Sequence, residues 1–307
     1  MQEGLVIKST GKWCEVRQEN GEIIDCQIKG KFRLAGIKTT NPLAVGDRVG
    51  FEIDVDGTGV ISVIHDRQNY IIRKSVNLSK QAHIVASNID HAFLVVTLAQ
   101  PATSTGFIDR FLVTADAYGV PVTIVFNKID VYDEQAKATQ AELTQIYEDA
   151  GYAIAESVAS EGIGVDTLAE AMKGKINMVS GHSGVGKSTL INQLIPDADI
   201  RTAEVSEYHL KGRHTTTFAE MHELPSGGFI IDTPGIKGFG LVDLPKEELH
   251  HHFPEMFALL PECKFNNCLH INEPGCAVKQ AVEHGEVSVS RFENYLMMYH
   301  EDEGPYR

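Results

Sequence analysis

Residues 181–188 of this 307-residue chain read Gly181-His182-Ser183-Gly184-Val185-Gly186-Lys187-Ser188, and this stretch decides the fold. The apolar run 176–180 before it predicts a short strand, and the run 188–194 after it predicts a helix. Between a strand and a helix, such a glycine-rich turn can present backbone N–H groups and the helix N-terminus to phosphate. We therefore predict a phosphate-binding loop in an α/β domain. A glycine-rich turn without a ligand is the alternative.

Within this loop, each residue type has a chemical task. Lys187 is expected to bridge the β- and γ-phosphate oxygens, and the Ser188 hydroxyl is expected to bind Mg²⁺. The predicted nucleotide contacts are Gly181, His182, Ser183, Gly184, Val185, Gly186, Lys187, Ser188 and Thr189.

A second motif selects the base. The apolar run 120–126 predicts a buried strand that leads into Asn127-Lys128-Ile129-Asp130. The Asp130 carboxylate can accept hydrogen bonds from the ring N–H and the exocyclic amine of guanine, whereas adenine offers no such pair of donors. Asn127 can bond the other edge of the base, and the stem of Lys128 can lie along it. Ser157 opens a Ser-Val-Ala segment similar to the loop that closes over guanine in other GTPases.

The order of the two motifs is unusual. In ordinary GTPases the phosphate loop opens the domain and the guanine motif lies near its end, but here Asn127–Asp130 precedes Gly181–Ser188. Both motifs are intact. We therefore predict a GTPase domain whose chain is circularly permuted, with the same site in space and different termini.

Two further segments have the character of nucleotide switches. The run 228–231 predicts a strand that ends at Asp232-Thr233-Pro234-Gly235, where Asp232 would hold Mg²⁺ through water and the Gly235 N–H would contact the γ-phosphate. Residues 212–217 lie where the first switch is expected, and either Thr215 or Thr216 supplies a second Mg²⁺ ligand. Such segments are ordered by γ-phosphate and Mg²⁺.

Position 236 departs from the common pattern. Many GTPases place a water-orienting glutamine there, whereas this chain has Ile236, which cannot orient water. We therefore expect slow intrinsic hydrolysis unless another group positions the water. His214 is the candidate, with Thr215, Thr216 and Lys187 completing the catalytic set. Alternatively, His214 only stabilises the switch or contacts a partner.

Four metal-binding side chains gather near the C-terminus. They are Cys263, Cys268, His270 and Cys276. Three thiolates and one imidazole complete a tetrahedral zinc set and leave no open position for catalysis, so we predict one structural Zn²⁺. The nearby run His250-His251-His252 is expected to be solvated or to face a partner, because consecutive residues cannot converge on one metal ion.

The N-terminal region alternates short apolar runs with turns, which predicts about five strands in a small barrel, with an OB-type barrel as the leading case. The basic stretch 29–33 contains Phe32 and could track an RNA backbone or be a solvated hairpin. The predicted organisation is an OB-like β-barrel at 1–70, a linker at 71–82, a circularly permuted α/β P-loop GTPase domain at 83–240 and a mainly helical zinc-knuckle domain at 241–307.

Composition sets outer limits. The formal net charge of −15 argues against indiscriminate nucleic-acid binding but leaves room for a local RNA footprint. No apolar run reaches the length of a membrane span and no signal peptide is visible, so we expect a cytoplasmic protein without membrane contact. We expect a monomer.

A barrel, a permuted GTPase with Gly212-Arg213-His214-Thr215-Thr216 and Asp232-Thr233-Pro234-Gly235, and then a Cys-Cys-His-Cys knuckle form a specific order. This order closely resembles the bacterial ribosome small-subunit-dependent GTPase family (RsgA, YjeQ or EngC) over essentially the whole chain. The resemblance implies GTP/GDP and Mg²⁺ as cofactors and action late in assembly of the small ribosomal subunit. It also implies stimulation by the subunit, and rRNA contacts through the barrel and the zinc domain. The alternatives are a switch that acts on a protein partner without RNA, and an assembly scaffold that uses GTP only for folding.

Overall fold

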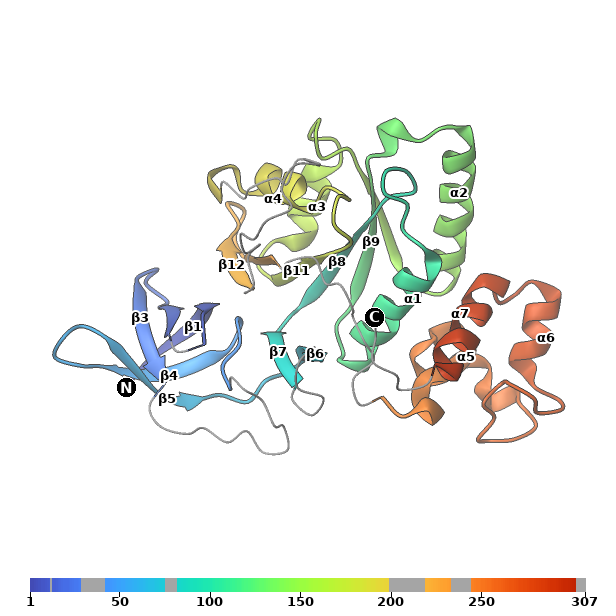
Figure 1. Ribbon diagram of the computed structural model, residues 1–307, viewed down its shortest axis with the longest axis horizontal. Coiled ribbons are helices and arrows are strands. Elements are labelled where there is room, and N and C mark those ends of the chain that lie inside the picture. Colours follow the sequence, from blue (N-terminus) through green and yellow to red (C-terminus); the bar gives the residue numbers. More distant parts are fainter. Residues whose placement is uncertain (12, 29–41, 75–81, 199–218, 233–243, 302–307) are drawn as a thin grey trace, which may run out of the picture.

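The computed structural model describes residues 1–11, 13–28, 42–74, 82–198, 219–232 and 244–301. Three parts lie side by side in Figure 1: a β-barrel at one end, an α/β part in the middle and a helical unit at the other end. This is the predicted fold class. Within the described residues, no helix has both the length and the apolar content needed to cross a bilayer.

The barrel consists of β1 (Gln2–Ser9), β2 (Trp13–Arg17), β3 (Ile23–Ile28), β4 (Arg48–Ile53) and β5 (Gly59–Ile64). Its order is β1-β2-β3-β5-β4, and β4 returns to pair with β1, so the barrel is closed. Only the β3–β5 pairing among these strands is parallel. Alternate residues such as Val6, Val16 and Phe51 fill the interior, as the period-2 pattern predicts.

In the α/β part, strand order differs from chain order. Its strands are β8 (His91–Val96), β9 (Val122–Asn127), β10 (Ala153–Ser157), β11 (Ile176–Ser180), β12 (Glu220–Glu223) and β13 (Phe229–Asp232). They run in the order β10-β9-β8-β11-β13-β12, and only β12 is antiparallel to its neighbour β13. Strand β11, which leads into the glycine-rich loop, thus lies between β8 and β13.

Helices connect and cover these strands. They are α1 (Thr105–Ala117), the 3₁₀ turn η1 (Ile129–Val131), α2 (Glu134–Asp149), α3 (Val165–Met172), α4 (Lys187–Leu194) and the turn η2 (Pro196–Ala198). On α1, the helically spaced Ile108, Phe111 and Leu112 are buried in the core over the sheet, as their spacing predicts.

The helical unit contains the turns η3 (Lys246–His252) and η4 (Leu260–Glu262) and the helices α5 (Pro254–Leu259), α6 (Ala277–His284) and α7 (Val289–His300). Its core includes Phe253, Met256 and Tyr295, and also Val113 from α1. Helix α1 therefore contributes to two cores, and in Figure 1 it lies between the sheet and the helical unit.

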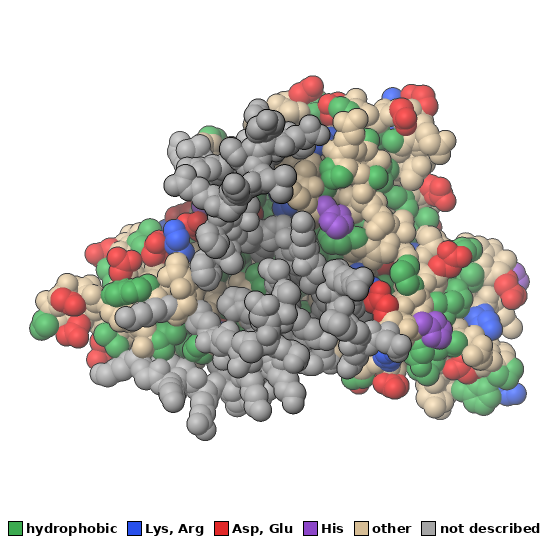
Figure 2. Space-filling model, in the orientation of Figure 1, with side chains coloured by type: hydrophobic (Ala, Val, Ile, Leu, Met, Phe, Trp, Pro, Cys, Tyr) green, Lys and Arg blue, Asp and Glu red, His purple; other side chains and the backbone are tan. Residues whose placement is uncertain are grey.

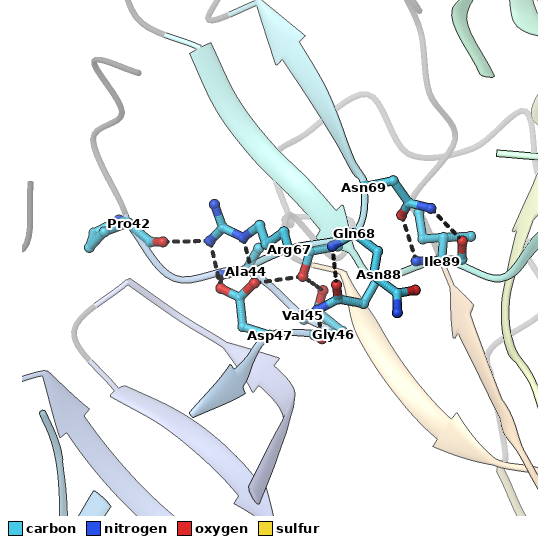
Figure 3. Close-up of polar contacts among 11 residues, drawn as sticks. Pro42, Ala44, Val45, Gly46, Asp47, Arg67, Gln68, Asn69, Asn88 and Ile89 are labelled. Atoms are coloured by element: carbon cyan, nitrogen blue, oxygen red, sulfur yellow. Dashed lines mark hydrogen bonds and ion pairs between the residues drawn. The ribbon is translucent and has the colours of Figure 1, made fainter. Parts of the chain in front are cut away.

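A buried ion pair between Asp47 and Arg67 lies where the barrel meets the segment that leads into the α/β part (Figure 3). The Asp47 carboxylate accepts from Arg67 Nε and Nη2 at 2.6 Å each and from the Ser87 hydroxyl at 2.6 Å. Asp47 is fully buried. Next to it, Asn88 Nδ2 donates to the Gly46 carbonyl at 2.8 Å. Both carboxylate oxygens are satisfied, which a buried charge requires.

The segment predicted as a linker contains regular structure. Strand β6 (Tyr70–Lys74) pairs antiparallel with β7 (Ala82–Ser87), so part of 71–82 is strand. A one-residue β1–β12 pairing, Lys8 opposite Glu220, also continues the barrel into the main sheet. The domain boundaries at 70, 82 and 240 stay predictions.

The barrel cysteines give a testable expectation. Cys14 and Cys26 lie opposite each other on β2 and β3, and burial raises the pKa of Cys14 to about 12 and of Cys26 to about 11. Because the thiolate is the nucleophile, we expect neither to be alkylated by iodoacetamide in the native protein at about pH 8, while the unfolded protein is modified readily. Peptide mass spectrometry measures this.

The same pKa shifts predict how the free energy of unfolding changes as the pH rises. The folded state keeps both thiols protonated. Their contribution to the free energy of unfolding is therefore complete below the ordinary thiol pKa, and it is lost as the pH rises toward the pKa values of the folded state. A Cys14→Ala variant should therefore lose stability less steeply in alkali than the parent. Equal alkylation rates in native and unfolded protein would contradict the burial of these thiols.

Candidate functional site

The glycine-rich loop follows a fully buried strand and ends in the first turn of α4. Its glycines are required by close approach: a Cβ on Gly181 would lie 2.2 Å from the Val95 carbonyl oxygen, and one on Gly186 would lie 2.4 Å from Asn127 Nδ2. Both residues also have positive φ, at 148° and 96°. The loop is therefore tightly held between β8 and the end of β9.

Lys187 closes the loop on itself. Its Nζ donates to the carbonyls of Gly181 at 2.7 Å and His182 at 2.6 Å, and the residue is 9% exposed. Burial lowers the pKa of Lys187, and the nearby Asp232 carboxylate opposes that effect. The ammonium thus lies inside the loop that would surround a phosphate group.

Asp232 ends β13 next to the loop. It pairs in register with Val179 of β11, so it lies at the carboxyl edge of the sheet from which the loop begins. Burial raises the pKa of the Asp232 carboxyl, although the charge of Lys187 acts in the opposite direction. A divalent cation here would favour the carboxylate form, and the Ser188 hydroxyl at the start of α4 would be the second oxygen ligand.

Asn127 joins three segments that are far apart in the chain. Its Nδ2 donates to the Val185 carbonyl at 2.8 Å, while its Oδ1 accepts from Ser157 Oγ at 3.0 Å and Ala159 N at 3.1 Å. The side chain is buried. The guanine motif, the glycine-rich loop and the Ser157 segment are therefore brought together as the permutation hypothesis requires.

Lys128 strengthens this junction. It has a left-handed backbone conformation, and its Nζ donates to the carbonyls of Gly184 at 2.8 Å and Gln100 at 3.2 Å. Ile129 and Asp130 follow in η1, and Asp130 is exposed. The Asp130 carboxylate is thus accessible to a base lying beside the Lys128 stem.

Several predicted site residues lie outside the described residues. They are His214, Thr215, Thr216 and Gly235, together with Ile236.

A separate cluster lies in the helical unit. One ligand atom from each of Cys263, Cys268, His270 and Cys276 lies within 4.8 Å of the others, and all four residues are buried. His270 Nδ1 lies 3.3 Å from Cys276 Sγ and 3.7 Å from Cys263 Sγ. The Glu273 carboxylate accepts from the backbone N–H groups of Leu269, Ile271 and Asn272, which holds the loop in shape.

The chemistry of this cluster fits a zinc ion. Burial without a cation raises the pKa of Cys268 to about 12, and it raises the pKa of Cys276 as well. Thiols in such a place are stable as thiolates only beside a positive charge, and three thiolates with one imidazole are a complete tetrahedral set for Zn²⁺. The cluster is thus compatible with zinc through Nδ1 of His270.

Comparisons with known proteins identify the family of this chain. A family model described as RsgA GTPase matches residues 64–242, and one described as RsgA N-terminal domain matches residues 3–61. The chain belongs to the RsgA GTPase family. Hydrolysis of GTP is therefore its activity.

Relatives in this family align with almost the whole chain. The small ribosomal subunit biogenesis GTPase RsgA of Bacteroides fragilis (strain YCH46) is 55% identical, with 99% of each chain covered. The crystal structure of YjeQ from Thermotoga maritima is 38% identical with a TM-score of 0.79, covering 97% of both chains. The structure of YloQ, described as a circularly permuted GTPase, is 29% identical with a TM-score of 0.75, covering 97% of this chain and 94% of its own.

Some contacts around the predicted nucleotide site were not expected from sequence. Tyr132 OH donates to the Asn127 carbonyl at 3.0 Å and accepts from Leu98 N at 2.9 Å, which fixes the end of β9. Lys128 also contacts the Gln100 carbonyl. Because this acceptor belongs to the backbone, the type of residue at position 100 does not predict the contact.

The histidine run corrects one expectation. His251 is exposed and His252 bonds the Asp116 carboxylate at 2.7 Å, but His250 is buried with its ring 5.0 Å from that of His270. The expectation that all three are solvated or partner-facing was therefore wrong for His250. Its burial lowers its pKa to about 4.

Proposed function

We propose that this GTPase acts in maturation of the small ribosomal subunit and that the subunit stimulates its hydrolysis. The observation that carries the proposal is the junction at Asn127, which joins the guanine motif to the phosphate loop in a chain whose relatives are named small ribosomal subunit biogenesis GTPases. Hydrolysis would then lower affinity for the subunit and release the protein.

At the nucleotide site, Asp130 and Asn127 would bind the two edges of guanine, with Lys128 along the base and Ser157 holding Asn127. Residues 181–189 would surround the phosphates. Ser188, Asp232 and either Thr215 or Thr216 would hold Mg²⁺, and the Gly235 N–H would meet the γ-phosphate. When bound, Mg²⁺ neutralises charge on the phosphate oxygens.

In hydrolysis, Lys187 would stabilise negative charge that develops on the transferred phosphoryl group. The Lys187 ammonium already lies within the loop, bonded to two carbonyls, and phosphate oxygens would replace these acceptors. Ile236 offers no group to orient water. His214 would do so, or would stabilise the switch while the subunit aligns the water.

The remaining assignments belong to the same proposal. The Cys263, Cys268, His270 and Cys276 cluster would hold one structural Zn²⁺, and the barrel and helical unit would contact rRNA. Figure 2 shows acidic side chains spread over one face, with few basic ones between them. Contacts with RNA would therefore be local, by a monomeric cytoplasmic protein with no membrane contact.

The first experiment is GTP turnover with purified small ribosomal subunits. We expect stimulation of more than about tenfold, which corresponds to about 1.4 kcal/mol of the activation barrier. The reason is that the subunit would align the attacking water, which Ile236 cannot orient. Phosphate release measures the rate, and large subunits at the same concentration are the control.

Other outcomes separate the alternatives. Equal rates with small and large subunits would contradict the proposed partner and favour a switch acting on a protein. Binding to the small subunit should also weaken steeply between about 50 and about 200 mM salt, because rRNA contacts release counterions. Absence of turnover with every candidate partner would favour a scaffold that uses GTP only for folding.

A further inference from the structure

Helix α1 begins against the phosphate loop. Its N-cap Ser104 accepts a hydrogen bond from Phe107 N at 3.3 Å, and the Phe107 ring lies over the His182 ring with centroids 3.7 Å apart and planes at 32°. His182 is in the loop, and its carbonyl accepts from Lys187 Nζ at 2.6 Å. The first turn of α1 thus packs on the residue whose backbone holds the phosphate-loop lysine.

The next turn of α1 is tied to the helical unit by a buried charge, that of Asp109. The fully buried Asp109 carboxylate accepts from Arg291 Nη1 at 2.7 Å and Asn294 Nδ2 at 2.6 Å, both on α7, and from Tyr147 OH at 3.0 Å. Arg291 also bonds both carboxylate oxygens of Glu255 on α5, at 2.8 and 2.9 Å. One guanidinium therefore joins α1, α5 and α7.

This connection is stiff. Arg291 is 1% exposed and lies 4.7 Å from the centroid of the Phe253 ring, and removal of Arg291 would leave the Asp109 carboxylate buried without the guanidinium that pairs with it. Farther along α1, Val113 packs in the core of the helical unit and Asp116 bonds His252. The helix and the helical unit therefore move together, if either moves.

We propose that the helical unit positions the phosphate loop through α1, with Asp109, Arg291 and Phe107 as positioning residues for nucleotide binding. Asp109 and Arg291 set the place of α1, and Phe107 sets the place of His182 in the loop. By thermodynamic reciprocity, nucleotide in the loop then acts on the helical unit by the same path. This inference rests on the proposed nucleotide site.

A double-mutant cycle tests the route. The first variant is Phe107→Leu, which removes the ring. The second is the paired Asp109→Asn/Arg291→Met made together with Glu255→Gln, because Glu255 also bonds Arg291 and would otherwise keep an unpaired carboxylate. The third combines the first two. We expect Phe107→Leu and the charge-pair variant each to weaken the binding of fluorescent GDP by about fivefold. The combined variant should bind GDP no more weakly than either of these two proteins. Multiplying effects, or unchanged affinity in the first two, would overturn the proposal.

The matched control is the buried ion pair between Asp47 and Arg67. Asp47→Asn/Arg67→Met removes a carboxylate–guanidinium pair of similar burial that holds the barrel. Its GDP affinity should equal that of the parent. An equal loss of affinity in this control would attribute the effect to general destabilisation and overturn the proposal. Arg291→Lys, which keeps the charge, should restore part of the affinity that is lost with methionine.

Hydrogen exchange gives a second readout that does not depend on the paired variant folding. Adding GDP to the full chain should slow exchange in α7 (Val289–His300), and Phe107→Leu should abolish that slowing while barrel strand β2 stays unchanged. GDP that binds without any effect on α7 would overturn the coupling alone. A chain that binds no GDP would instead overturn the proposed nucleotide site.

Discussion

Lys187→Met is expected to lower GTP hydrolysis by about 10²–10³-fold, the loss typical when a positioned group that stabilises transition-state charge is removed. Methionine keeps a long buried stem, so the fold should persist, while the ammonium that now bonds the Gly181 and His182 carbonyls is lost. Single-turnover phosphate release at saturating GTP measures the chemical step. Titration with fluorescent nucleotide measures the accompanying loss of affinity.

Lys175 provides the matched control for this experiment. Lys175 lies just before strand β11, at the opposite end of that strand from the glycine-rich loop. It is exposed, and its Nζ donates to the Ala171 carbonyl at 2.9 Å. Lys175→Met should leave turnover unchanged. If Lys187→Met lost no more activity than Lys175→Met, the phosphate site would have to be placed elsewhere in the chain.

Cys268→Ser is expected to remove the metal and unfold the helical unit. Structural zinc contributes about 10–16 kcal/mol of apparent binding free energy in small zinc domains, as much as the whole stability of a typical domain. The unit is small, and the four ligands lie within its core. Zinc content by atomic emission and amide exchange in α6 and α7 measure the two effects.

The control for this prediction is a cysteine of equal burial outside the cluster. Cys14→Ser in the barrel should keep one zinc per chain and leave exchange in α6 and α7 unchanged. Equal zinc content in the Cys268→Ser and Cys14→Ser proteins would contradict the metal assignment. Chelation of the parent protein should reproduce the Cys268→Ser result and leave the barrel folded.

Prediction from sequence worked where the signal is local. The strand before Gly181, the helix after Lys187 and the five barrel strands follow from apolar periodicity and turn residues, and the structure confirms these elements. The Cys263–Cys276 cluster was found because its ligands lie close together in the chain and belong to residue types with one shared chemistry. The assigned roles of the site residues stay predictions.

Prediction was weaker where partners are distant. The pairing of β6 with β7 was not expected, because a short strand with one partner differs little in composition from a loop. His250 was expected to be solvated or to face a partner, because consecutive residues cannot converge on one metal ion, yet the fold buries it beside His270. The Asp47–Arg67 and Asp109–Arg291 pairs carry no sequence signal, because a charged residue is exposed by default.

The sequence by itself determined the two nucleotide motifs, their permuted order, the barrel pattern and the cluster of three cysteines and one histidine, since spacing along a strand, a turn or a knuckle is enough to recognise each. Only the tertiary structure decided that β11 lies between β8 and β13, that Asn127 bonds Val185, and that α1 connects the loop to Arg291. Local patterns encode backbone preference and burial one element at a time. Contacts between elements depend on how all buried surfaces and charges are satisfied together, and that is settled only when the whole chain packs.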